Sequence, residues 1–166
     1  MVIVPRTGNL SITTSHNVII NSVKIFLSVS FSSKVDEKGK VDKAYRSDLE
    51  IMIQKLEDEG HEVFCAPRAE GWRVADHDPV HALKMDFSEI DTSDVYVAIV
   101  SNVVSAGVQL ETGYALAKQK RIVLASPSGE KLGWTNNALI GFDNVSGVNF
   151  ELYDELADQI LQLVMR

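Results

Sequence analysis

The chain has 166 residues, which is enough for one domain with a sizeable core. Apolar residues make up 45% and charged residues 23% of a globular composition, and no apolar run approaches the roughly 18 residues of a membrane span. The formal net charge of -7 repels a phosphate backbone, so DNA and RNA are excluded as probable partners, and no membrane partner is expected.

The first 22 residues and the single cysteine stand out in the composition. Residues 1–22 contain no Asp, Glu or Lys and are predicted to form an N-terminal extension, either an added hairpin or a disordered segment. Residues 23–166 are predicted to form a single α/β domain. Cys65 cannot form an internal disulfide, which suits a cytoplasmic protein, and its apolar neighbours predict a small, buried hydrophobic side chain.

Short apolar runs alternate with helical patterns from Val23 onward. Strands are predicted at 24–29, 61–66, 94–100, 121–125 and 145–150, and helices at 41–60, 81–90, 105–118, 134–140 and 152–165. This alternation predicts a mostly parallel five-stranded sheet with helices on both faces, a Rossmann-like, flavodoxin-type three-layer sandwich. Ligands of such folds bind beyond the carboxyl ends of the strands.

The segment after the third strand holds the first candidate catalytic residue. Ser105 is predicted to cap a helix, and Gly107 permits close approach of a ligand to its first turn. Glu111 follows within two turns, where its helix face is lined by the small residues Gly107 and Ala115. This pattern favours a carboxylate that faces a packed pocket, while a solvated Glu that complements the helix dipole is the alternative.

A second carboxylate, Asp86, lies on the helix before the third strand. Two carboxyl groups at one edge of a sheet can serve as a nucleophile and a proton donor, and in retaining glycosidases they stand roughly 5–5.5 Å apart. The nearby Asp91 and Asp94 are interpreted as structural residues of the helix-to-strand turn.

Other polar candidates are less specific. Trp72, after the second strand, faces a base or covers the core. His77 and His81 are four residues apart, but Pro79 interrupts a regular helix and no third ligand matches, so no metal site is expected. The sequence contains neither a Walker nor a Rossmann glycine pattern, and no cofactor is expected.

Together these residues resemble the nucleoside 2-deoxyribosyltransferase superfamily, which includes the 2'-deoxynucleoside 5'-phosphate N-hydrolases. The resemblance rests on Asp86, Asp94, the apolar strand through Val100, and the pattern Ser105-x-Gly107-x-x-x-Glu111-x-Gly-Tyr-Ala. It covers roughly residues 24–140.

The resemblance implies an enzyme that cleaves the base–sugar bond of a nucleoside or nucleoside 5'-monophosphate. Glu111 matches the nucleophile that forms a glycosyl ester, and Asp86 the group that assists proton transfer to the departing base. Ser105 matches a residue that contacts sugar or phosphate. Asn137 falls where relatives lend a polar side chain across a homodimer interface.

The sequence departs from the superfamily after the first strand. Relatives have a Gly-containing turn there, and the nucleotide hydrolases add a phosphate-binding Arg, whereas this chain has Ser28, Ser30 and Phe31, with Phe31 in place of the Arg. These residues are candidates for substrate binding, with Lys34 as a cation for phosphate. A transferase that exchanges bases and a nucleotide-binding module without catalysis remain alternatives to the hydrolase.

Overall fold

The computed structural model describes residues 22–30, 34–73, 78–101 and 105–165. The predicted extension therefore lies outside the described residues except for Ser22, as do Phe31 and His77. Within the described ranges, no helix is both long and apolar enough to cross a membrane.

The described residues form five strands and six helices. The strands are β1 (Lys24–Val29), β2 (Glu62–Phe64), β3 (Val95–Ile99), β4 (Arg121–Pro127) and β5 (Val145–Phe150). The helices are α1 (Lys43–Asp58), α2 (Ala66–Ala69), α3 (Pro79–Thr92), α4 (Ala106–Ala117), α5 (Trp134–Leu139) and α6 (Tyr153–Val164). All predicted elements are present, and only the short α2 was not predicted.

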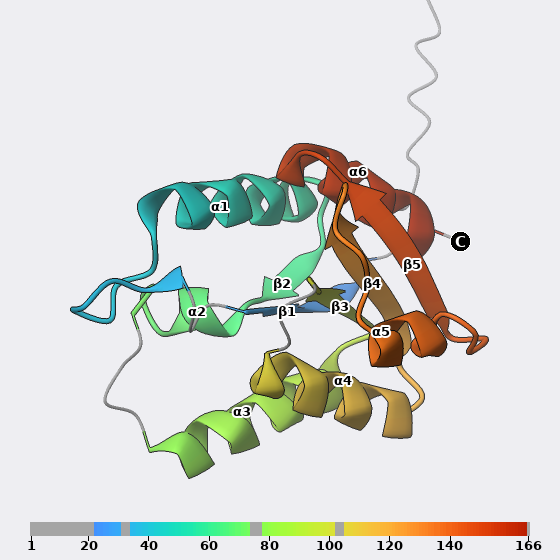
Figure 1. The fold of residues 1–166 in the computed structure, drawn as a ribbon, viewed down its shortest axis with the longest axis horizontal. Helices are drawn as coiled ribbons and strands as arrows, with labels where there is room; N and C mark the ends of the chain where they lie inside the picture. Colours follow the sequence, from blue (N-terminus) through green and yellow to red (C-terminus); the bar gives the residue numbers. More distant parts are fainter. Residues whose placement is uncertain (1–21, 31–33, 74–77, 102–104, 166) are drawn as a thin grey trace, which may run out of the picture.

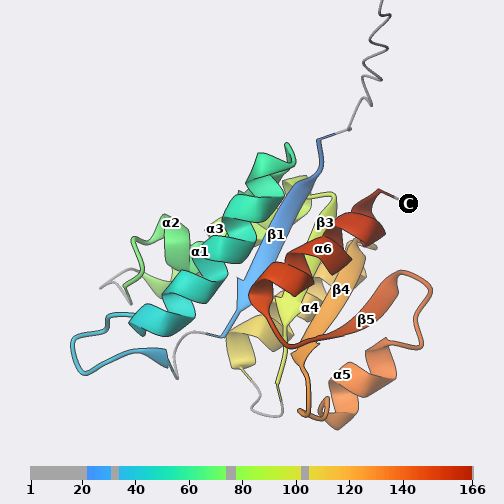
Figure 2. The same cartoon turned by 90° about the horizontal axis from the view of Figure 1, so that it is seen from above.

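The strands form one sheet in the order β2-β1-β3-β4-β5, and every neighbouring pair is parallel. Helices α1 and α6 cover one face, whereas α3 and α4 cover the other (Figures 1 and 2). The predicted flavodoxin-type three-layer sandwich is thereby confirmed. The chain adds β2 on one side of β1, and it then adds β3, β4 and β5 on the other side. The order of the strands therefore reverses between β1 and β3, and folds of this type form a ligand-binding crevice at the carboxyl ends of two such strands.

The sheet separates two apolar layers, because alternate side chains of a strand point to opposite faces. Leu27 of β1 packs with Leu49 and Leu56 of α1, whereas Phe26 packs with Ile90 of α3 and Val108 of α4. The side chains of β1 and β3 are almost entirely buried, which explains their continuous apolar runs. Ser28 is two residues after Phe26 in β1, so its side chain points to the same face, toward α3 and α4.

Candidate active site

Glu111 lies on α4 at the carboxyl edge of the sheet. The helix begins after Ser105, whose hydroxyl caps it by accepting from the Val108 N–H at 3.5 Å, as predicted. This start places Glu111 in the second turn, facing the end of β1. There the Ser28 hydroxyl donates a hydrogen bond to Glu111 Oε2. The contact joins residues 83 positions apart in the sequence.

Burial gives the Glu111 carboxyl an unusual affinity for a proton. Loss of solvent around the largely buried side chain raises its pKa from 4.5 to about 7, against the Ser28 hydrogen bond, which lowers the pKa. The negative charge of Asp86 raises it further. The two predicted carboxylates therefore lie within range of each other's charge.

Asp86, on α3, is half-buried and has a pKa raised from 3.8 to about 6, first by burial and then by the charges of Glu70 and Glu89. Its Oδ1 atom is buried and has no hydrogen-bond partner among the described residues. A buried carboxyl oxygen without a donor is costly, and that cost is relieved when the group carries a proton or meets a donor on a ligand. A carboxyl group in this state is suited to donating a proton near neutral pH.

Gly107 keeps the space beside Glu111 open. A methyl group at this position would lie 3.8 Å from Glu111 Oε1 and 3.9 Å from Ser105 Oγ. Oε2 is held by Ser28, so Oε1 is the carboxylate oxygen on the Gly107 side. The absence of a side chain at Gly107 thus leaves room for a ligand atom to approach both residues.

Small hollows continue from this point along the ends of β1, β3 and β4. One, of about 10 Å³, is lined by Ser30, Ile99, Val100, Ser101, Ser105, Val108, Gln109 and Asn136. A second, of about 150 Å³, shares Ser30, Ile99 and Ser101 and adds Lys34, Tyr45, Pro127, Glu130 and Tyr153. The structure therefore brings Ser28, Ser30, Ser105, Gly107 and Glu111 to one edge of the sheet.

Two other candidates lie elsewhere. Trp72 is 5% exposed and packs in the core on the α1 face, with the Arg46 guanidinium 5.4 Å from its ring centroid, so the structure does not bring it to Glu111. Asn137 is exposed on α5, whereas its neighbour Asn136 is buried and accepts a hydrogen bond from Gln109 Nε2 at 3.0 Å.

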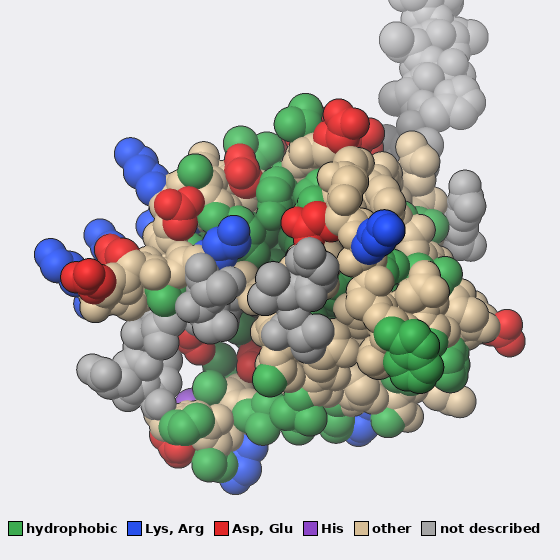
Figure 3. All heavy atoms as spheres, viewed as in Figure 1, with side chains coloured by type: hydrophobic (Ala, Val, Ile, Leu, Met, Phe, Trp, Pro, Cys, Tyr) green, Lys and Arg blue, Asp and Glu red, His purple; other side chains and the backbone are tan. Residues whose placement is uncertain are grey.

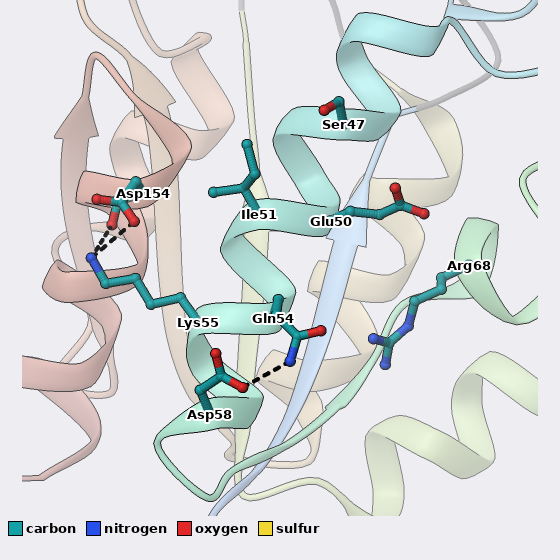
Figure 4. A pocket seen from close by; sticks show the side chains of 8 residues that line it. All are labelled: Ser47, Glu50, Ile51, Gln54, Lys55, Asp58, Arg68 and Asp154. Carbon is teal, nitrogen blue, oxygen red and sulfur yellow. Dashed lines mark hydrogen bonds and ion pairs between the residues drawn. The ribbon is translucent and has the colours of Figure 1, made fainter.

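A larger hollow, about 740 Å³, is a groove along the outer side of α1 (Figure 4). Its charged side chains already have partners: Lys55 pairs with Asp154 and Asp158, and Arg68 with Glu57. It is separated from Glu111 and Asp86 by the sheet and lacks a buried carboxyl group. We therefore place the candidate site at the carboxyl edge of the sheet, where Glu111 is largely buried and the buried Oδ1 atom of Asp86 has no hydrogen-bond partner among the described residues.

The sequence did not single out Tyr96 or Thr112. The Tyr96 hydroxyl contacts Thr112 Oγ1 at 3.0 Å and the Val108 carbonyl oxygen at 3.3 Å, in a fully buried position. A tyrosine in an otherwise aliphatic strand was the available signal, because a buried phenol needs a hydrogen-bond partner. The described residues contain no cluster of His, Cys, Asp and Glu arranged to hold a metal ion.

The fold and site define a flavodoxin-type α/β protein with two carboxyl groups of raised pKa at the reversal between β1 and β3. No protein-family model and no curated protein matches the chain. Among solved structures, the CMP N-glycosidase BcmB of Clostridium botulinum aligns with 84% of this chain and 98% of its own, at 23% identity and a TM-score of 0.64.

Two further structures share the fold. BlsM, in its solution structure, aligns with 84% of this chain and 87% of its own, at 28% identity and a TM-score of 0.71. A conserved protein from Enterococcus faecalis V583 aligns with 86% and 99%, at 18% identity and a TM-score of 0.56. These likenesses confirm the fold, and BcmB is by name an enzyme of the kind that the sequence resemblance indicated.

Proposed function

We propose that the protein is an N-glycosidase that hydrolyses the base–sugar bond of a nucleoside 5'-monophosphate or nucleoside through a covalent ester with Glu111. The observation that carries this proposal is the buried Glu111 carboxylate, fixed by Ser28 and coupled to the Asp86 carboxyl at the carboxyl edge of the sheet. The likeness of fold to a CMP N-glycosidase supports the same reaction class.

The reaction proceeds by two displacements. Glu111 attacks the anomeric carbon while the bond from that carbon to the base nitrogen breaks, and its electron pair leaves with the base. Asp86, in its protonated form, donates the proton that the base accepts. Water then attacks the same carbon and gives one proton to the Asp86 carboxylate, while the bond to Glu111 breaks with its electron pair; the sugar leaves, and both the Glu111 carboxylate and the protonated Asp86 are regenerated.

Local charge favours a phosphorylated substrate. Lys34, Lys38, Lys40 and Lys43 are exposed in and beside the segment that precedes α1, and they outnumber its exposed acidic residues Asp36, Glu37 and Asp42. Basic and acidic side chains both project at this end of the molecule in Figure 3. Lys34 also lines the 150 Å³ hollow together with the hydroxyl groups of Ser30 and Ser101. A lysine and nearby hydroxyls suit a monophosphate, although the chain's net charge is negative.

Chromatography of purified protein with a panel of ribo- and deoxyribonucleosides and their 5'-monophosphates tests the function. We expect free base and sugar from at least one monophosphate, and none when Glu111→Gln replaces the native chain. A new nucleoside formed in the presence of an added base would identify a transferase instead. Binding without any turnover would contradict the proposal and favour a nucleotide-binding module.

We also propose a homodimer in which Asn137 reaches the site of the partner subunit. On the same helix Trp134 is 87% exposed, and Ile140 and Phe142 beyond it are also exposed, an apolar surface suited to contact with a second copy. Mixed dimers of Glu111→Gln and Asn137→Ala chains provide the test. Each variant alone is expected to be impaired, whereas mixing restores activity because one site of a mixed dimer has both native residues. No restoration in mixed dimers would refute the shared site.

A further inference from the structure

The Ser28 hydroxyl occupies a position that substrate contact does not explain. Its side chain is 2% exposed, and its hydrogen bond goes to Glu111 Oε2 rather than into the open space beside Gly107. Among the described residues, the hydrogen bond to the Glu111 carboxylate is this one, and it holds Oε2. The other, Oε1, faces the space that the missing side chain of Gly107 leaves open.

Tyr96 extends this contact to the backbone of α4. Its phenol oxygen reaches Thr112 Oγ1 at 3.0 Å and the Val108 carbonyl at 3.3 Å, on either side of Glu111 in the helix. Thr112 also donates to the Val108 carbonyl at 2.6 Å. The hydroxyl of Ser28 lowers the pKa of Tyr96, so it lies beside the phenol as well as the carboxylate. These contacts tie the turn that carries Glu111 to β1 and β3.

We propose that Ser28 is a positioning residue that fixes Glu111 Oε2, so that Oε1 attacks the anomeric carbon, and that Tyr96 supports it by holding α4 against β3. This inference rests on the proposed function. A carboxylate held by one oxygen keeps its other oxygen in a single orientation, which reduces the entropic cost of reaching the transition state. The donated hydrogen bond also favours the ionised, nucleophilic form.

The titratable groups around Glu111 determine which ionisations a pH profile of kcat can contain. Asp86 faces it from α3, Tyr96 from β3 and the buried Cys65 from the end of β2. Burial raises the pKa of the Cys65 thiol to about 12 and that of the Tyr96 phenol well above its usual range. Asp86 is thus the group in this set that ionises together with Glu111 near neutral pH.

The test uses the full chain with Ser28→Ala, Ser28→Thr and Tyr96→Phe. Ser126→Ala is the matched control, because Ser126 is a fully buried serine of β4 whose hydroxyl has no partner among the described residues. Two quantities are measured: the pH profile of kcat and the pKa of Glu111 from its side-chain ¹³C NMR signal. The NMR titration needs no turnover.

We expect Ser28→Ala to lower kcat by roughly 10- to 100-fold, the loss of one charge-assisted hydrogen bond. The pKa of Glu111 should rise above about 7. Because Asp86 ionises at about 6, below Glu111, the alkaline limb of the profile should move to higher pH with it. Ser28→Thr should restore most of the native kcat and of the native Glu111 pKa. Tyr96→Phe should lower kcat less than Ser28→Ala does, and Ser126→Ala should match the native chain. A folded Ser28→Ala variant with native kcat and Glu111 pKa would overturn the proposal, and if that variant does not fold, a Tyr96→Phe chain that matches the native one would do so.

The attacking oxygen is tested with a slow 2'-fluoro substrate analogue that traps the ester for a crystal structure. The ester is expected on Oε1 with Ser28 still bonded to Oε2, and an ester on Oε2 would refute the assignment. If the native chain cleaves no nucleoside or nucleotide, the proposed function itself is wrong and the role in catalysis falls with it. The NMR titration would then still show whether Ser28 holds the carboxylate.

Discussion

The two faces of the sheet bury different kinds of side chain beside it. On the α1 and α6 face, aliphatic side chains such as Leu49, Leu56 and Ile160 fill the layer, and the large groove outside α1 is lined by charged groups that pair with one another. On the α3 and α4 face, the buried hydroxyl groups of Ser28, Tyr96 and Thr112 are followed by the largely buried Glu111 and the half-buried Asp86. A buried carboxyl oxygen without a hydrogen-bond partner among the described residues, such as Asp86 Oδ1, costs stability, and two carboxyl groups of raised pKa within range of each other's charge are typical of a functional site; we therefore propose this face as the functional one.

Removing the nucleophile gives the largest expected effect. Glu111→Gln keeps the shape of the side chain but cannot form a glycosyl ester, so kcat should fall by roughly a thousandfold or more. Steady-state base release measures it. Glu59→Gln, an exposed residue at the end of α1, is the control and should retain full activity. If the Glu111→Gln variant were as active as the native chain, the proposed active site on the α3 and α4 face would be refuted.

Asp86→Asn removes the proton donor and should lower kcat by about 10²- to 10⁴-fold with natural bases. The loss should shrink with a leaving group that departs without a proton, because general acid catalysis then contributes little. Asp91→Asn is the control on the same helix, since Asp91 is exposed and paired with Lys118. An equal loss for good and poor leaving groups would indicate that Asp86 acts in another way.

Leu56→Ala tests the apolar face. The side chain is fully buried, so truncation should lower the free energy of unfolding by about 2–5 kcal/mol without changing kcat per folded molecule. Ile51→Ala on the same helix, where the side chain is 50% exposed, should cost well under half as much. Urea denaturation compares the two variants. A selective loss of kcat in folded Leu56→Ala would show that the two faces are not functionally distinct.

Glu111→Gln should also stabilise the protein at high pH. The native carboxyl holds its proton up to about pH 7, whereas the unfolded one releases it near 4.5, so ionisation makes folding less favourable as pH rises between these values. The variant avoids this cost, which is up to about 3 kcal/mol at pH 8, and should show no such advantage at pH 4. Thermal unfolding at both pH values measures the difference. An advantage that is the same at both would contradict the raised pKa.

The pH dependence of kcat/KM should be bell-shaped, with its maximum between about pH 6 and 7. Below this range both carboxyls are protonated and no nucleophile remains, and above it both are ionised and no acid remains. Asp86→Asn should lower the pKa of Glu111, because it removes the negative charge that raises it. A flat profile from pH 5 to 8 would be inconsistent with the coupled pair.

The sequence predicted most of the fold because periodicity and capping are local signals. The apolar runs located β1 and β3, and Ser105 and Gly107 located the start of α4. The short α2 was not predicted, because four residues carry no helical periodicity; its Pro67 stands in the first turn, where proline is favoured.

Of the candidate site, the sequence could indicate the two carboxylates proposed for catalysis but not the contacts around them. Glu111 and Asp86 belong to a pattern that the chain carries within a short segment, whereas the hydrogen bond from Ser28 joins elements far apart in the sequence and depends on the register of β1 against β3. The placement of Trp72 on the opposite face could not be predicted either, because it also depends on contacts between distant residues. Trp72 follows α2 and packs beneath Arg46 of α1. No local pattern distinguished the buried Asn136 from the exposed Asn137.

The most direct test of the central claim is mass spectrometry of the protein quenched during turnover of a nucleoside 5'-monophosphate, or trapped with its 2'-fluoro analogue. The account requires one added sugar phosphate on the peptide that contains Glu111, lost on further incubation and absent from Glu111→Gln. Base release by the native chain with no adduct on Glu111, or with the adduct on another residue, would contradict the covalent mechanism.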